Sequence, residues 1–373
     1  MHTANFAGLE RAMERCMEQD WLAGYSIYVS HADEPPYVRY AGYADRDAGI
    51  PIRENTLFRI MSMAKPMTAA AAMALVERGK LRLEDPVRKY VPCTEWVYDG
   101  NGAKVPLPAD RDLTVLHLCN HTNGLGMSGG HMEELFRATE GRDKGLAMWA
   151  EAAAKVPLEF MPGTRTGYSS YAGFTLLGHV LEVAAGMPFE DVLRTYLHEP
   201  LGMEPPKFHL EAGEMPRLSR LYNTTDEGLT AVPQNYFPSP YPEDVHLHTG
   251  AGGLFMTLED GARFAGMLAG EGTWRGVRVL KPETVKAMTA NTLSPGLFLE
   301  PGVQWGIGIA LYGDTDAYPC APGSFGWSGY YGNKFWVDPA RRLFAVYMFN
   351  VIGGHKEDIR RLIEGEVYAG LNA

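Results

Sequence analysis

The order in which strand-like and helix-like segments follow one another constrains the fold of this chain most strongly. Strand-like runs lie near both ends of the sequence: 25–30, 37–43, 306–312, 334–337 and 343–350. The stretch between is rich in Pro and Gly, and its periodic parts have the spacing of helices. Because strands must meet in space to form a sheet, we expect the two ends to build one sheet around a helical insertion.

This order predicts an α+β fold with two domains. The first is discontinuous, residues 1–85 and 246–373, and holds an antiparallel sheet flanked by terminal helices. The second, residues 86–245, is mostly helical. Clefts between domains are favoured ligand sites, so the active site is expected there.

Helices are predicted from the spacing of apolar residues and from residues that are typical of helix ends. The terminal helices are expected over 4–18 and around 359–367, and an Ala- and Met-rich helix over 61–78. Thr257 is the predicted N-cap of a helix that runs to Leu268. The stretch 206–245 is expected to be loop-like. Helices in the middle region are predicted over 115–119, 131–138, 144–154, 171–185 and 189–197.

Charge and cysteine content exclude several classes of function. The net charge of −11 argues against nucleic acid as a partner, because phosphate binding needs a basic patch. The cysteines form no CxxC pair, so neither a disulfide framework nor a zinc site is expected, and we predict no metal and no cofactor. The four cysteines are Cys16, Cys93, Cys119 and Cys320.

The N-terminal stretch has no continuous apolar segment of the signal-peptide kind. No apolar run approaches the roughly 18–20 residues needed to cross a bilayer. The simplest prediction is a soluble, cytoplasmic protein without a membrane partner. Nothing in the sequence indicates an oligomeric state.

The strongest chemical motif is Ser62-Met63-Ala64-Lys65, at the head of the predicted helix over 61–78. A spacing of three places the serine and the lysine on one helix face. A serine hydroxyl becomes nucleophilic when a neighbour accepts its proton, and a lysine does so when burial lowers its pKa. The alternative is an ordinary helix start with an exposed lysine. The apolar segment 69–74 favours the functional interpretation, because it is too apolar for a solvated helix.

Two further elements carry candidate residues. Tyr168 lies in a loop, 162–171, ahead of an apolar helix, where a phenol projecting into a cleft acts as a general base. Packing is the alternative role for this tyrosine. The run 325–332 contains glycines that let the backbone approach a ligand, so the N–H groups of Tyr330 and Ser62 are expected to form an oxyanion hole. A glycine-rich edge strand without function is the alternative there.

A competing serine motif is Gly126-Met127-Ser128-Gly129-Gly130, which matches the Gly-x-Ser-x-Gly elbow of α/β-hydrolases. That elbow needs a preceding strand, whereas 114–120 has the pattern of a helix. Ser128 is therefore not predicted to be catalytic. His121, His246 and His248 are interpreted as structural or cleft-wall residues.

The order and separation of the three elements resemble the serine β-lactamase and penicillin-binding protein superfamily, whose motifs are Ser-x-x-Lys, Tyr-x-Asn and Lys-Thr-Gly. The resemblance covers nearly the whole chain, and its connecting segments are similar to the class C-like branch. The tryptophan-led motif Trp327-Ser328-Gly329 is similar to that of the family VIII carboxylesterases. The resemblance implies a β-lactamase/transpeptidase-like fold with Ser62 as nucleophile, Lys65 and Tyr168 as the base pair, and backbone N–H groups of Ser62 and Tyr330 as the oxyanion hole.

Two departures from the superfamily pattern bear on the substrate. Trp327 stands in place of a lysine that helps hold the substrate carboxylate of β-lactamases, a contact worth about 1.5–3 kcal/mol. Ser170 stands in place of the asparagine that binds the acylamino side chain. Both changes suit a neutral, partly apolar acyl ester. The predicted substrate-binding residues are Trp327, Ser328, Gly329 and Ser170.

The predicted function is therefore that of a carboxylesterase acting through an acyl-Ser62 intermediate on a small-molecule ester or amide. Within enzymes, the alternatives are a β-lactamase, a D-amino-acid peptidase or other amidase, and an acyltransferase. A non-enzymatic alternative is an inactive penicillin-binding-like module that binds a ligand.

Overall fold

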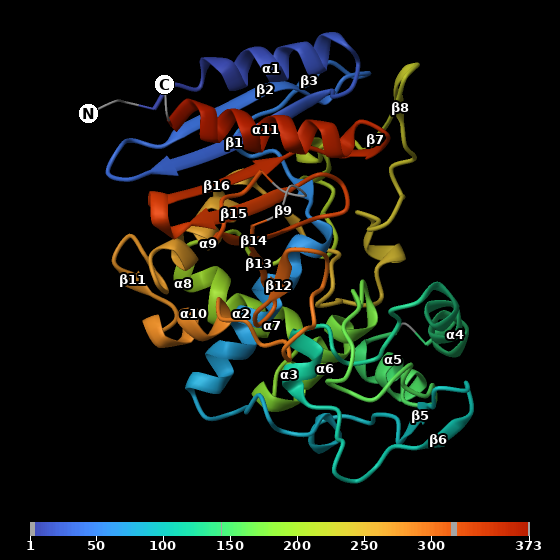
Figure 1. The fold of residues 1–373 in the computed structure, drawn as a ribbon. Helices are drawn as coiled ribbons and strands as arrows, with labels where there is room; N and C mark the ends of the chain where they lie inside the picture. The colour runs from blue at the N-terminus through green and yellow to red at the C-terminus, as the bar shows by residue number, and fades with distance from the viewer. Residues whose placement is uncertain (1–3, 143, 315–318, 372–373) are drawn as a thin grey trace.

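The main sheet is assembled from the two ends of the chain (Figure 1). The computed structural model describes residues 4–142, 144–314 and 319–371. Eight strands follow the order β12-β13-β14-β15-β16-β1-β2-β3, and neighbouring strands are antiparallel. The predicted α+β class is confirmed. The strands are β1 (Gly24–His31), β2 (Tyr37–Asp45), β3 (Ile50–Pro51), β12 (Val303–Trp305), β13 (Ala310–Tyr312), β14 (Phe325–Ser328), β15 (Lys334–Asp338) and β16 (Leu343–Met348).

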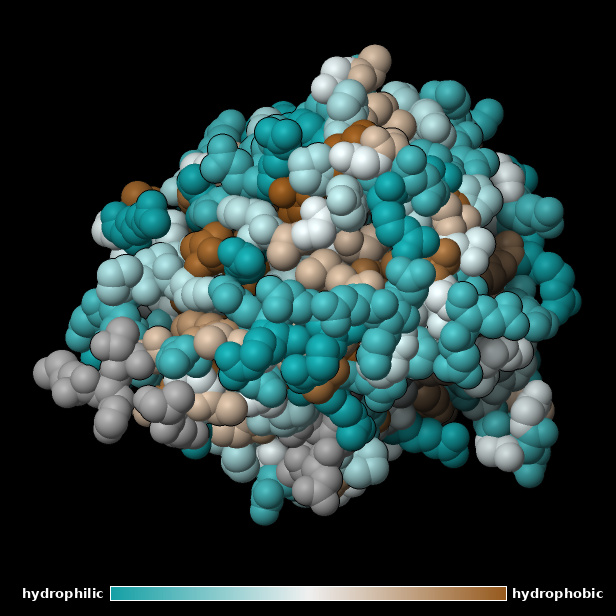
Figure 2. All heavy atoms as spheres, turned by 90° about the horizontal axis from the view of Figure 1, so that it is seen from above, coloured by the Kyte–Doolittle hydropathy of each residue, from teal (hydrophilic) through white to brown (hydrophobic). Residues whose placement is uncertain are grey.

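Helices cover both faces of this sheet. α1 and α11 pack against each other on one face, and α9 contacts β1, β15 and β16 on the other (Figure 1). Figure 2, which looks down on the molecule from the α1 side, shows mainly hydrophilic residues with isolated apolar ones, as expected of an outer layer. The helices are α1 (Ala7–Glu18), α2 (Ala64–Glu77), α3 (Val115–Cys119), α4 (Gly129–Thr139), α5 (Leu146–Ala153), α6 (Ala172–Ala185), α7 (Phe189–Leu193), α8 (Glu199–Leu201), α9 (Leu258–Ala269), α10 (Pro282–Met288) and α11 (Lys356–Leu371).

Side chains of successive residues in β16 point to opposite faces of the sheet and contact a different helix on each face. The Tyr347 hydroxyl donates a hydrogen bond to Glu364 of α11 at 3.0 Å. The adjacent Val346 and Met348 face α9, where a Cβ added to Gly261 would lie 3.1 and 2.8 Å from their side chains. Successive strand residues point to opposite faces, so a strand covered on both faces has a continuous apolar sequence.

Shorter strands complete the fold and were not predicted, because two to four residues are too few to show a period. The structure differs most from the predicted strand over 306–312. β12 ends at Trp305 and β13 begins at Ala310, with a turn between them in which the Gly306 N–H donates to the Ile309 carbonyl. The short strands are β4 (Phe58–Arg59) paired with β9 (Phe255–Met256), β5 (Trp96–Tyr98) with β6 (Lys104–Pro106), β7 (Tyr222–Thr225) with β8 (Gly228–Ala231) and β17 (Val351–Gly353), and β10 (Thr273–Trp274) with β11 (Val277–Arg278).

The region 86–245 contains α3 to α8 and the short strands β5 to β8. The predicted helix over 189–197 is α7 continued by a π-helical turn, Arg194–His198. Among the described residues, no single helix is long and apolar enough to cross a membrane. Residues 172–185 and 189–201 together have the length and composition for it, but they are bent by 78° relative to each other.

Helix α2 lies in the centre of the molecule and carries the Ser-x-x-Lys motif at its start. Every residue from Ala64 to Leu75 is buried. A helix that is apolar on all sides belongs in a core, and its alanines allow close neighbours. Gly308 is one such neighbour, because a Cβ there would lie 2.2 Å from the Ala69 Cβ.

Asn333 joins the strand before Ser62 to the turn after β14. Its side-chain amide donates to the Arg59 carbonyl at 2.7 Å and its side-chain oxygen accepts from the Phe349 N–H at 3.1 Å. Its own carbonyl accepts from the Gly329 N–H at 2.7 Å. Asn333 therefore fixes two segments of the candidate site relative to each other.

We expect Asn333→Ala to lower the free energy of unfolding by about 2–4 kcal/mol, because two buried backbone groups lose their partners. Urea denaturation measures the change, with the exposed Asn101→Ala as a control that stays within about 0.5 kcal/mol of the parent. An equal, small effect of both substitutions would contradict this role.

Candidate active site

Ser62 and Lys65 lie together at the beginning of α2. Ser62 is in the 3₁₀ turn Met61–Met63 that precedes the helix, and the Lys65 Nζ lies 2.9 Å from its Oγ. The backbone of Met61 has a positive φ of 49°, which turns the chain sharply before the serine. The serine is half-buried, so the residue is not sealed from solvent.

Lys65 is fully buried and has two backbone carbonyls as further partners. Its Nζ lies 2.7 Å from the Ser170 carbonyl oxygen and 2.8 Å from that of Ala251. Burial holds the pKa of Lys65 well below that of an ordinary lysine. A neutral amine has two N–H groups, which the two carbonyls accept, and its lone pair is then left for the Ser62 hydroxyl.

Tyr168 lies beside this pair. The Lys65 Nζ is 5.2 Å from the centre of its ring, and its hydroxyl oxygen is buried. Burial raises the pKa of Tyr168 to about 12, while Ser62 and Trp327 act in the opposite direction. Tyr168 therefore stays a neutral phenol near neutral pH rather than a phenolate.

His121 supports the turn that holds Tyr168. It has a positive φ of 59° and is buried, with its ring 4.8 Å from that of Tyr168. Its Nδ1 accepts from the Ser169 N–H at 3.2 Å, and its carbonyl accepts from the Gly167 N–H at 3.2 Å. These contacts agree with the structural role expected from the sequence.

The Trp327-Ser328-Gly329 segment passes directly beside the nucleophile turn. A Cβ at Gly329 would lie 2.1 Å from the Ile60 carbonyl oxygen, so only glycine fits there. β14 is an interior strand between β13 and β15, not the edge strand considered as an alternative. Trp327 is only 8% exposed and packs on Tyr168 and Trp305, so it does not present the open surface expected from the sequence.

The two predicted oxyanion donors flank this contact. Within the described parts of the chain, the backbone N–H groups of Ser62 and Tyr330 make no hydrogen bond. Unpaired N–H groups beside a nucleophile are suited to stabilise a developing oxyanion. Of the other predicted binding residues, Ser170 has an exposed side chain and Ser328 is half-buried.

Ser128 of the competing motif has a structural role instead. It is the N-cap of α4, where its side chain accepts from the His131 N–H at 3.4 Å. His248 stacks on Phe208 with ring centres 4.4 Å apart and lies 3.2 Å from a Glu190 carboxylate oxygen.

A cavity of about 390 Å³ opens beside residues 249–253, which contain the Ala251 carbonyl and are called the Lys65 acceptor loop here. Several of its walls are aromatic, and none of its lining residues is Lys or Arg. It is lined by Tyr171, Phe208, Asn235, Phe237, Pro238, Ser239, Asp244, Val245, His246, Leu247, Thr249 and Gly253. The described residues contain no group of three or more His, Cys, Asp or Glu that could hold a metal ion.

Two residues of this site were missed by the sequence reasoning. Ala251 contributes only its backbone carbonyl, so its side chain gives no indication of the contact with Lys65. The neighbouring glycines are the one local signal in the sequence. Arg59 is buried and donates to the carbonyls of Pro238, Ser219 and Gln234, which fixes one wall of the cavity next to the nucleophile strand. Burial lowers the pKa of Arg59 to about 10.

An antiparallel sheet with both terminal helices on one face and α9 on the other, together with Ser-x-x-Lys at the head of a buried helix, defines a serine hydrolase of the β-lactamase fold. The family profile described as Beta-lactamase matches residues 9–367, and the chain belongs to that family. The predicted membership of the wider serine β-lactamase and penicillin-binding protein superfamily is thereby confirmed.

Individual relatives and structures support this assignment. The chain is 31% identical to Protein Rv1367c of Mycobacterium tuberculosis (strain ATCC 25618 / H37Rv), over 92% of this chain and 90% of that protein. It is 30% identical to Esterase EstB of Burkholderia gladioli, with the same coverage of both chains. The solved structure of EstCE1, described as a hydrolase with promiscuous acyltransferase activity, has a TM-score of 0.80 and 22% identity, covering 97% of each chain.

Proposed function

We propose that this protein is a carboxylesterase that cleaves neutral esters through a covalent acyl-Ser62 intermediate. The observation that carries the proposal is the buried Lys65 amine, 2.9 Å from the Ser62 hydroxyl and bound to two carbonyls. A serine activated by a neutral lysine is a nucleophile for acyl transfer.

The proposed reaction assigns a role to each group. The Ser62 oxygen attacks the ester carbonyl while its proton passes to Lys65, and the N–H groups of Ser62 and Tyr330 stabilise the oxyanion. As the tetrahedral species collapses, the C–O bond to the alcohol breaks and the alcohol oxygen takes a proton from Lys65 or through the Tyr168 hydroxyl. Water then attacks the acyl-serine, and the carboxylic acid leaves with Ser62 restored.

Esters are favoured over β-lactams by the charges of the site. Trp327 stands where a cation would hold a substrate carboxylate, and the neighbouring cavity has no Lys or Arg in its lining. The similarity to Esterase EstB supports the same activity. Amide and β-lactam hydrolysis remain the competing activities of this family.

A substrate panel tests the proposal. We expect kcat/KM for short p-nitrophenyl esters to exceed that for nitrocefin by about 10- to 100-fold, because the charge-assisted contact that would hold the nitrocefin carboxylate, worth about 1.5–3 kcal/mol, is missing. We expect it to exceed that for D-alanyl p-nitroanilide as well, because an amide is less reactive than a p-nitrophenyl ester. Absorbance assays with one enzyme preparation measure all three. A preference for the lactam or the amide would overturn the assignment to esters.

A further inference from the structure

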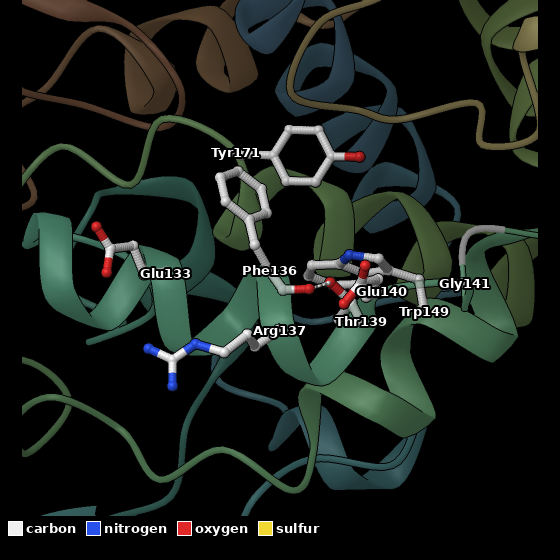
Figure 3. Close-up of a pocket in the computed structure, with 8 residues that line it drawn as sticks. All are labelled: Glu133, Phe136, Arg137, Thr139, Glu140, Gly141, Trp149 and Tyr171. Carbon is white, nitrogen blue, oxygen red and sulfur yellow. Dashed lines mark hydrogen bonds between the residues drawn. The ribbon is translucent and has the colours of Figure 1, made fainter.

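A second cavity, of about 590 Å³, lies next to the candidate active site, between α4, α5 and the start of α6 (Figure 3). Tyr171 lines both this cavity and the one beside the Lys65 acceptor loop. It directly follows Ser170, whose carbonyl binds Lys65. The two cavities therefore meet at Tyr171, one residue after a carbonyl that binds the Lys65 amine. The second cavity is lined by Glu133, Phe136, Arg137, Thr139, Glu140, Gly141, Trp149 and Tyr171.

Three aromatic rings from three separate elements meet in this cavity. The ring centres of Phe136 and Trp149 each lie 6.1 Å from that of Tyr171, with planes inclined by 57° and 78°. Rings at this spacing and inclination pack edge to face rather than in a parallel stack. Trp149 is buried, so Phe136 and Tyr171 supply the accessible ring surface. Phe136 is 53% exposed although it is a large apolar residue. Aromatic faces arranged around one space are the usual binding site of quaternary ammonium groups.

The charges around the rings favour a cation as well. Glu133 and Glu140 line the cavity, and within the described residues neither forms an ion pair. Arg137 is the basic residue among the lining residues, and Figure 3 shows its side chain extending away from the rings, whereas Glu140 lies beside Trp149. The whole chain carries a net charge of −11, which adds a long-range attraction for cations.

We propose that this cavity binds the cationic end of an ester substrate, a trialkylammonium or similar ammonium group, while the ester lies at Ser62. The proposal rests on the ester hydrolysis proposed above. It assigns Phe136 and Glu140 to recognition of the cation. Phe136 supplies an exposed ring, and Glu140, beside Trp149, supplies a negative charge in the lining of the same cavity.

A pair of isosteric esters tests the proposal. Butyrylcholine and 3,3-dimethylbutyl butyrate have nearly the same shape but differ in one positive charge. We expect kcat/KM to favour the choline ester by about tenfold, mainly through KM, as a partly exposed cation–π contact and one nearby carboxylate together supply. Phe136→Leu and Glu140→Gln should each reduce this ratio at least about threefold, because each substitution weakens binding of the choline ester more than binding of the neutral ester. Tyr43→Leu, an exposed ring on β2, should leave the ratio unchanged.

Direct binding separates this proposal from the esterase assignment. Tetramethylammonium binding, measured by titration calorimetry, should weaken at least about threefold in Phe136→Leu and stay unchanged in Tyr43→Leu. Equal binding by all three proteins, or an ester ratio near one in an enzyme that cleaves p-nitrophenyl acetate, would overturn the cation site alone. If no ester were hydrolysed but tetramethylammonium still bound more weakly to Phe136→Leu than to the parent, the esterase assignment would be overturned and the cation site would be supported.

Discussion

Replacing Ser62 with alanine is expected to lower turnover of a p-nitrophenyl ester by at least about 10⁴-fold while the protein stays folded. Ala removes the oxygen that forms the acyl bond, and loss of the nucleophile in a serine hydrolase costs four orders of magnitude or more. The substitution removes only one hydroxyl from a half-buried position, so a native circular dichroism spectrum should accompany the loss.

Ser128→Ala is the matched control, because Ser128 lies in the other serine motif of the chain. As the N-cap of α4, it contributes about 1 kcal/mol to stability and nothing to turnover in this account. We expect ester hydrolysis by Ser128→Ala to stay within about twofold of the parent. The reverse pattern, an active Ser62→Ala and an inactive Ser128→Ala, would move the nucleophile to the second motif.

Replacing Lys65 with methionine is expected to lower kcat/KM by about 10²- to 10⁴-fold, the contribution of a positioned general base. Methionine keeps the length and burial of the side chain but has no lone pair suited to accept the Ser62 proton. Lys80→Met, an exposed lysine just beyond α2, is the control and should retain full activity.

The same lysine sets the pH dependence of the parent enzyme. Burial lowers the pKa of Lys65, and only the neutral amine accepts a proton, so kcat/KM should rise as pH rises through that lowered pKa and fall as pH falls below it. In Lys65→Met this decrease of kcat/KM at low pH should disappear, along with most of the activity. If the residual activity of Lys65→Met decreased at low pH as in the parent, another group would be the proton acceptor.

Local signals in the sequence were enough to predict that Ser62 and Lys65 lie side by side, and to predict most of the long helices and strands. Ser62 and Lys65 are three residues apart at the start of an apolar helix, so their proximity follows from helix geometry alone. The Thr257 cap is confirmed, because its side chain accepts from the Asp260 N–H at 3.2 Å. Such interactions span few residues and are therefore visible in the order of the side chains.

Contacts between residues far apart in the sequence could not be predicted from such local signals. The Ala251 carbonyl meets Lys65 across 186 positions, and Asn333 meets Arg59 across 274. Both depend on how the two ends of the chain pack together. The predicted strand over 306–312 failed for a local reason, because Gly308, with a φ of 74°, belongs to a turn inside an apolar run. The burial of Trp327 followed from the interior place of β14, which the glycine-rich sequence did not reveal.

Mass spectrometry of the protein quenched during turnover of a slowly hydrolysed ester tests the central claim most directly. We expect the acyl group to add its mass at one site, on the peptide that contains Ser62, and the adduct to be absent from Ser62→Ala. An acyl group on the Ser128 peptide, or full turnover by Ser62→Ala without any adduct, would contradict it.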